Sequence, residues 1–451
     1  MSVSSAITFW LTSANRSVLL KKQEDLLPFT DTANDYQNIL VDATCSYQPI
    51  EGFGFSLTGG SAYLINRLSP LIRSKLLREI FSTDDDGIST SYLRISIGAS
   101  DLSKTTFSYN DIPAGQSDPT LVRFDIGAGD SDLIPLLKEI IAINPKIKIM
   151  GTPWSAPPWM KTNDSFIGGK LHPDHYRVYA EYLVKYLQTM KDNGIFVHAM
   201  TPQNEPLNHK NEPSMVMAAM EQVDFIKNHL GPALRSANFQ NVELFCWDHN
   251  CDEKGYPLTV LSDPDVRDYL TGVAWHLYAG DVTAISDVHW AYPDMKMAFT
   301  EQWVGLDGNF ADDLVWHMKN VMVGTIRNWS RIVLEWNLAA DFYCGPHTPS
   351  GESRCVGAFT IGIPGEEIVR NVSYYVIAHA AKFVRPGSMR IFSSLVDDLP
   401  NVAFKTQEGG IVLLVLNETR NQKTFGIQFG EKVATATLDG GSVGSYLWQI
   451  A

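Results

Sequence analysis

The chain has no apolar run long enough to cross a membrane. None of its hydrophobic stretches approaches the roughly 18 to 20 residues that a spanning helix needs. Its first residues, MSVSSAITFW, also lack the basic start and apolar core of a secretory leader. We therefore expect no stable membrane insertion. We expect a secreted or periplasmic location, for which the leader would have been removed from this sequence.

Sequence patterns for metal and nucleotide binding are absent as well. The chain contains no CxxC, HExxH, GxGxxG or GxxxxGK[ST] pattern. We expect neither a metal nor an organic cofactor. Its five cysteines form two local pairs, Cys246 with Cys251 and Cys344 with Cys355, and leave Cys45 alone. Each pair permits a short disulfide, and free thiols are an equal alternative.

Positive charge is scarce. Lysine and arginine number 36 against 50 aspartates and glutamates, a net charge of −14. This balance argues against nucleic acid and anionic membranes, which require clustered cations. A neutral or cationic substrate is compatible with the negative net charge. We expect the protein to be a monomer. A hydrophobic content of 45% and 11 tryptophans can fill a large core and still leave flat aromatic faces for sugars.

Eight nearly continuous apolar runs alternate with helical patterns between residues 50 and 340, as strands buried on both faces do. The predicted strands are 52–57, 91–98, 146–154, 196–205, 242–250, 272–280, 295–303 and 331–339. Predicted helices begin near residues 69, 132, 175, 214 and 311. Eight such units predict a (β/α)8 barrel over residues 51–385.

The sequence changes character after residue 386. Short β-rich stretches such as GGIVLLVLNET are separated by Gly, Asn and Asp turns, which predicts an antiparallel domain over 386–451. Residues 1–50 have a similar composition, and we expect them to add strands to this sandwich-like β domain. Because no flexible linker separates the barrel from these strands, rigid packing is expected.

Two glutamates end predicted strands of the barrel. Glu205 closes the fourth strand within TPQNEP, and Glu301 closes the seventh within FTEQW. Pro206 favours an extended strand end at Glu205. The carboxyl ends of barrel strands form the face where active sites are built. A pair of carboxylates in one cleft is the requirement of glycoside hydrolysis.

Further polar and aromatic residues occupy the other strand ends, and their common placement favours a shared site. The candidates for substrate binding are Arg94, Asp101, Trp154, Asn204, His276, Tyr278, Trp336 and Asn337. Trp154 lies in a proline-rich loop and is expected to be held as a platform. The segment Asp248-His249-Asn250 follows the fifth strand and gives only weak evidence for a role in orienting neighbours.

The segments GFGFSLTGGSA, LRISIGASDLS, GTPWSAPPWMKTN, TPQNEP, AWHLYAG, FTEQW and EWNLA, in this order, resemble glycoside hydrolase family 30. That family includes acid β-glucosylceramidases and β-1,6-glucanases. The resemblance covers nearly the whole chain and implies that Glu205 is the general acid/base and Glu301 the nucleophile. It also places Arg94, Asp101, Trp154, Asn204, Tyr278 and Trp336 around the bound sugar. The chain departs from the glucosylceramidases at Gly59 and directly after Glu301.

The resemblance therefore predicts a retaining hydrolase of β-D-glucosidic bonds, acting on β-1,6-glucan or a related β-glucoside. A glucosylceramidase, an exo-β-glucosidase and a non-catalytic carbohydrate-binding protein are the alternatives. Retention requires the two carboxyl groups to lie about 5 to 5.5 Å apart, against about 6.5 to 9.5 Å for inversion. The acid also requires a raised pKa at Glu205, while Glu301 stays ionised.

Overall fold

The computed structural model describes residues 5–32, 34–84, 87–362 and 367–450. Eight parallel strands close into a barrel in the order β10-β11-β13-β5-β6-β7-β8-β9, which confirms the predicted fold class. The barrel strands are β5 (Gly52–Ser56), β6 (Tyr92–Ile97), β7 (Lys148–Pro153), β8 (Ala199–Met200), β9 (Glu243–Cys251), β10 (Gly272–Gly280), β11 (Lys296–Glu301) and β13 (Ser330–Asn337). Each predicted strand corresponds to one of these, although β8 is much shorter than predicted.

Side chains from seven of the eight strands fill the barrel interior. This buried cluster contains Tyr92, Met150, Ala199, Phe245, Ala274, Ala298, Ile332 and Leu334. Strand β5 supplies glycines instead, and a Cβ on Gly52 would lie 3.1 Å from the Cβ of Tyr92. The interior is therefore a packed core, and the space for a substrate lies at the mouth.

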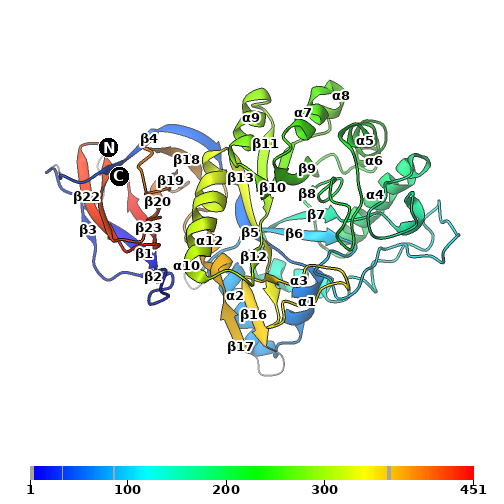
Figure 1. Ribbon diagram of the computed structural model, residues 1–451, viewed down its shortest axis with the longest axis horizontal. Coiled ribbons are helices and arrows are strands. Elements are labelled where there is room, and N and C mark those ends of the chain that lie inside the picture. The colour runs from blue at the N-terminus through cyan, green and yellow to red at the C-terminus, as the bar shows by residue number, and fades with distance from the viewer. Residues whose placement is uncertain (1–4, 33, 85–86, 363–366, 451) are drawn as a thin grey trace.

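Helices surround the barrel (Figure 1). They are α1 (Gly59–Asn66), α2 (Pro70–Phe81), α3 (Leu133–Ile143), α4 (Tyr176–Asp192), α5 (Ala219–Phe225), α6 (Gly231–Ser236), α7 (Gly255–Ser262), α8 (Pro264–Arg267), α9 (Thr283–Ala291), α10 (Phe310–Trp316), α11 (Thr325–Arg327) and α12 (Val372–Ala381). The helix predicted from Ser214 begins later, at Ala219. The reason is that the backbone N–H groups of Ser214 and Val216 bond to the loop at Phe166 and Gly169.

The β domain joins the two ends of the chain. Its strands pair in the order β2-β1-β23-β20-β19-β18-β4-β21-β22, with β3 on β1. From the N-terminal part come β1 (Ala6–Thr12), β2 (Lys21–Lys22), β3 (Leu27–Pro28) and β4 (Asn38–Pro49). From the C-terminal part come β18 (Met389–Ser393), β19 (Asn401–Lys405), β20 (Gly410–Leu416), β21 (Lys423–Phe429), β22 (Lys432–Leu438) and β23 (Val443–Gln449). The expected pairing of the two ends is present, while the proposed domain boundaries stay predictions.

Helix α12 lies between the barrel and the β domain (Figure 1). All of its residues are buried, which explains why no amphipathic pattern marked it in the sequence. His379 on this helix lies 2.8 Å from Thr12 Oγ1 and 2.7 Å from Ser445 Oγ. Arg327 likewise donates to Ser393 and Asn401 of the β domain. These buried contacts support the expected rigid packing.

A short excursion between β13 and α12 was not predicted. It contains β14 (Ala339–Ala340), β15 (Cys355–Val356), β16 (Phe359–Gly362) and β17 (Glu367–Arg370), and β15 pairs with β12 (Val304–Gly305). The excursion brings Glu352 to the barrel mouth. All five cysteines are free thiols in the structure. Among the described residues, no helix has both the length and the apolar character needed to cross a membrane.

Candidate active site

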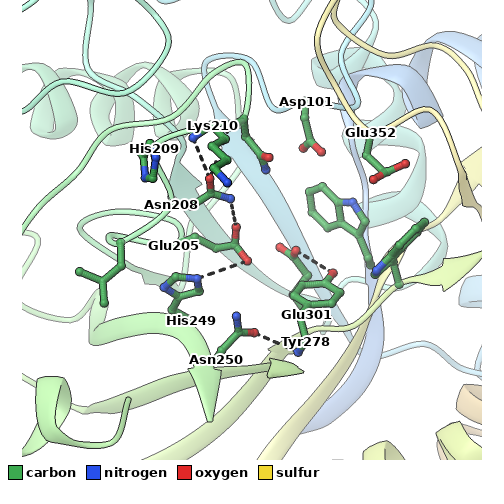
Figure 2. Close-up of a pocket in the computed structure, with 14 residues that line it drawn as sticks. Asp101, Glu205, Asn208, His209, Lys210, His249, Asn250, Tyr278, Glu301 and Glu352 are labelled. Atoms are coloured by element: carbon green, nitrogen blue, oxygen red, sulfur yellow. Dashed lines mark hydrogen bonds and ion pairs between the residues drawn. The ribbon is translucent and has the colours of Figure 1, made fainter. Parts of the chain in front are cut away.

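Two buried glutamates lie together at the carboxyl ends of the barrel strands. Glu205 follows β8 and Glu301 is the last residue of β11. An oxygen of each carboxylate and a ring nitrogen of His276 all lie within 4.8 Å of one another. Both carboxyl groups point into one pocket (Figure 2). The two carboxylates therefore approach each other closely, as retention requires, whereas inversion needs a wider gap.

The backbone at Glu205 differs from the extended strand end that Pro206 favours. Its φ is +43°, in the left-handed region that non-glycine residues rarely adopt. The Glu205 N–H donates to the carbonyl of Asp248 at 3.0 Å, and the Asn208 N–H donates to the carbonyl of Glu205 at 2.8 Å. Such strain persists only where surrounding contacts fix it, and it concentrates at functional sites.

Arg94 on β6 is fully buried behind the two glutamates. Its Nη1 donates to Glu301 Oε2 at 2.5 Å. Its Nη2 donates to Asn204 Oδ1 at 2.6 Å and to Asp248 Oδ2 at 2.9 Å. The guanidinium also lies 4.8 Å above the ring of Trp154, a cation–π distance. Arg94 therefore holds Glu301 in one orientation and offsets part of the negative charge of the cluster.

Asp248 on β9 links the two cations of the site. Besides Arg94, it accepts from His276 Nε2 at 3.1 Å, from Thr300 Oγ1 at 2.7 Å and from Thr201 Oγ1 at 2.8 Å. Burial opposes its ionisation, but Arg94 and His276 outweigh that effect and hold the pKa of Asp248 well below its usual range. A permanently ionised carboxylate thus lies at the base of the site.

His276 on β10 faces a carboxylate with each ring nitrogen. Nδ1 lies 3.2 Å from Glu205 Oε1, and Nε2 contacts Asp248. Burial alone would lower the pKa of His276, but Glu301 and the bonds to Asp248 and Glu205 raise it to about 9. Because both nitrogens face acceptors, one exchangeable proton is shared between His276 and Glu205.

The pKa order of the two glutamates is the reverse of the sequence-based expectation. Burial would raise the pKa of Glu205, but the hydrogen bond from His276, the charges of His249 and His276, and Asn208 lower it to about 2. Burial raises the pKa of Glu301, against the charges of His276 and Arg94. The expectation of a raised pKa at Glu205 was wrong, because the hydrogen bonds and charges that His276, His249 and Asn208 direct at its carboxylate outweigh its burial.

A pocket of about 410 Å³ opens above the glutamates. It is lined by Asp101, Glu205, Leu207, Asn208, His209, Lys210, Asn211, His249, Asn250, Tyr278, Glu301, Trp303, Trp336 and Glu352. The Tyr278 hydroxyl donates to Glu301 Oε1 at 3.0 Å. Burial and the nearby charges of Glu301 and Glu205 raise the pKa of Asp101 to about 8. At neutral pH Asp101 can therefore donate a hydrogen bond as well as accept one.

Of the ten residues singled out from the sequence, five line this pocket: Asp101, Glu205, Tyr278, Glu301 and Trp336. Arg94, Asn204 and His276 lie behind the carboxylates and bond to them or to each other. Trp154 is buried and stacks against Trp336 with ring centroids 5.3 Å apart, so it supports the tryptophan that lines the pocket. Asn337 lies outside the pocket lining and accepts from the hydroxyls of Thr58 and Ser61 at the start of α1.

Sequence reasoning gave too little weight to Asp248 and His249 and missed Asn208. Asp248 is an acid near the carboxyl end of a buried strand, a signal similar to that of Glu205. Asn208 donates to Glu205 Oε2 at 2.7 Å, and His249 Nε2 lies 3.8 Å from Glu205 Oε1. No sequence signal marks Asn208, because its contact with Glu205 depends on the turn between them.

Glu205, His276 and Glu301 are close enough to share a cation. Arg94 and His276 already supply positive charge to this cluster. Among the described residues, no fourth histidine, cysteine or carboxylate has a ligand atom within 4.8 Å of all three. The donor set therefore fits paired carboxylates acting directly better than a metal centre.

A (β/α)8 barrel with two carboxylates this close at its mouth is the arrangement that glycoside hydrolases use. Two family models match the chain: "Glycosyl hydrolase family 30 TIM-barrel domain" over residues 50–384 and "Glycosyl hydrolase family 30 beta sandwich domain" over residues 387–446. The protein belongs to glycoside hydrolase family 30, which confirms the resemblance seen in the sequence.

The chain is similar to curated members of the family. It is 34% identical to endo-1,6-beta-D-glucanase neg1 of Aspergillus fumigatus over 78% of this chain and 74% of that protein. It is 28% identical to putative glucosylceramidase 4 of Caenorhabditis elegans over 87% and 79%. Among solved structures, the endo-beta1,6-glucanase BT3312 superposes with a TM-score of 0.91 at 33% identity, covering 99% of this chain and 100% of that one.

Proposed function

We propose that this enzyme hydrolyses β-1,6-linked glucan with retention of anomeric configuration. The observation that carries the proposal is the pair of carboxylate oxygens, on Glu205 and Glu301, within 4.8 Å of each other at the barrel mouth. A close approach of this kind suits direct attack by one carboxylate on the sugar carbon, whereas inversion needs a wider gap that holds an activated water.

In the first step Glu301 attacks the anomeric carbon as the bond to the leaving oxygen breaks. Arg94 and Tyr278 orient the Glu301 carboxylate for this attack. The leaving oxygen takes its electron pair and the proton that Glu205 shares with His276. In the second step Glu205 removes a proton from water, the water oxygen bonds to the anomeric carbon, and Glu301 is released.

The pocket walls support a sugar polymer as substrate. Most of the lining residues carry a polar group, and Trp336 offers a flat face for a pyranose ring. The relatives named as endo-1,6-glucanases are 33 to 34% identical to this chain, against 27 to 29% for those named as glucosylceramidases. Glucosylceramide is the second candidate, and it would require an apolar surface for two acyl chains beside this polar mouth.

Products released from linear β-1,6-glucan test the substrate. Early gentio-oligosaccharides on a chromatogram indicate endo cleavage, and glucose alone indicates exo cleavage. No release, together with turnover of glucosylceramide, would move the assignment to the second candidate. Because a β-1,6-glucan polymer is too large to enter a cell readily, we also propose that the enzyme acts outside the cytoplasm. Fractionation of the native host would test this location.

Substitution of the two glutamates tests the mechanism. We expect Glu301→Gln to abolish turnover of every β-glucoside. We expect Glu205→Gln to lower kcat on gentio-oligosaccharides by roughly 10²- to 10⁴-fold. Its effect on kcat/KM for 2,4-dinitrophenyl β-glucoside should be much smaller, because kcat/KM reports the first step and that leaving group needs no proton. Glu181→Gln, the same change on the outer surface of α4, is the control that should keep wild-type activity. Full activity in Glu301→Gln would exclude the assignment.

A further inference from the structure

Asn208 makes two hydrogen bonds to Glu205. The backbone N–H of Asn208 donates to the Glu205 carbonyl at 2.8 Å, which closes a turn. Its side-chain Nδ2 donates to Glu205 Oε2 at 2.7 Å. The residue lies on the same side of the pocket as Glu205 and His249 (Figure 2). The turn therefore places the Asn208 side-chain N–H against one oxygen of the Glu205 carboxylate, Oε2.

The orientation of the Asn208 amide follows from its other contacts. Oδ1 accepts from the backbone N–H of Lys210 at 2.9 Å and of Asn211 at 3.4 Å. A backbone N–H can only donate, so the atom facing these two groups must be the carbonyl oxygen. The atom facing Glu205 is then the NH₂ group, which cannot accept a proton in return.

The two oxygens of Glu205 consequently differ in what they can do. Oε2 receives an N–H from Asn208, so the lone pair on that side cannot carry a proton. Oε1 faces His276 Nδ1 at 3.2 Å, with which it can exchange one. A charge-assisted bond of the kind that Asn208 makes also favours the ionised carboxylate.

We propose that Asn208 is a positioning residue for the acid/base: it fixes the plane of the Glu205 carboxyl group and assigns the transferable proton to Oε1. The inference rests on the proposed function, since it presupposes that Glu205 donates a proton to the leaving oxygen. Asn208 touches neither the anomeric carbon nor the leaving group in this role. It acts through Glu205, by favouring the ionised base that the second step requires.

The test is the pH dependence of kcat/KM on gentio-oligosaccharides for wild type, Asn208→Leu and Asn208→Asp. The alkaline limb reports the loss of the acid proton. Leucine removes the hydrogen-bond donor that stabilises ionised Glu205. The alkaline limb of the pH profile should therefore shift to higher pH by about one unit. Aspartate puts a second carboxylate against Oε2, and the two would share a proton, so its limb should move further. The aspartate variant keeps an oxygen for the N–H groups of Lys210 and Asn211, so its fold should survive if that of the leucine variant does not.

2,4-Dinitrophenyl β-glucoside supplies the internal control, because its departure needs no acid. With this substrate, both variants should lose much less of the first-step rate than they lose on gentio-oligosaccharides, while the second step slows. Equal losses on both substrates with an unchanged alkaline limb would mean a purely structural role and overturn the inference. A wild-type enzyme inactive on all β-glucosides would instead overturn the proposed function, so the two failures are distinguishable.

Discussion

At the scale of single residues, the site depends on backbone conformations that sequence patterns do not reveal. Trp247 and Asp248 have φ values of +71° and +65° within β9, and Glu205 has +43°. These left-handed residues turn one strand end towards the next, so that the Glu205 N–H meets the Asp248 carbonyl. The residue types could be identified from the sequence, whereas the left-handed backbone conformations that orient their side chains could not.

Asp248→Asn tests the importance of the buried charge network. The change removes one anion from beside Arg94 and His276 while preserving shape. Breaking a buried ion pair by removing one partner costs about 3–5 kcal/mol, and we expect the free energy of unfolding to fall by that order. Chemical denaturation measures it. Asp252→Asn, an exposed position just beyond β9, is the matched control and should change stability by less than about 0.5 kcal/mol.

At the scale of elements, the barrel strands and four of the five predicted helix starts agree with the structure, and the start of α5 does not. Buried parallel strands read as continuous apolar runs, and this signal located all eight. Strand β8 is short because the chain leaves the sheet early to form the strained turn at Glu205. The start of α5 was misplaced because loop contacts at Ser214 and Val216 compete with helix formation. Such contacts between distant segments are invisible to local periodicity.

Gly54→Ala tests the close approach of β5 and β6. A Cβ at this position would lie 1.8 Å from the Tyr92 carbonyl oxygen, so the two strands would have to separate. We expect the free energy of unfolding to fall by at least about 3 kcal/mol, which is the upper end of the usual cost of overpacking a core. Gly115→Ala is the control. It has a φ of +76° with no atom within 4 Å of the new Cβ, and should cost only about 1 kcal/mol. Equal stabilities of the two variants in thermal unfolding would contradict the steric argument.

At the scale of the whole molecule, the ends of the chain form one sheet that packs against the last barrel helix. Strand β1 pairs with β23, and both contact α12 through the hydroxyls that meet His379. Similar composition at the two termini was enough to predict their pairing. It could not predict the polar contacts across the interface, because α12 itself had no recognisable pattern.

His379→Gln tests this interface by its pH dependence. Burial lowers the pKa of His379 to about 3, below the value of about 6.5 expected in the unfolded chain. The neutral histidine therefore contributes its full stability above pH 6.5, and that stability is lost as the pH falls towards 3. Between about pH 7.5 and pH 5 the loss is about 2 kcal/mol. Glutamine does not titrate, so the stability difference between wild type and variant should shift by that amount in favour of the variant at the lower pH. A constant difference in denaturation midpoints across this range would contradict the expectation.

The sequence by itself determined the barrel, the attached β domain and the two glutamates. Hydrophobic periodicity and strand-end position are local properties, so they can be read from neighbouring residues in the sequence. Only the tertiary structure decided that Asp248 joins Arg94 to His276, that Trp154 stacks against Trp336, and that the pKa of His276 is raised by the carboxylates around it. Each of these depends on which charges and rings meet after the strands close, and the pKa values follow from distances that no single segment contains.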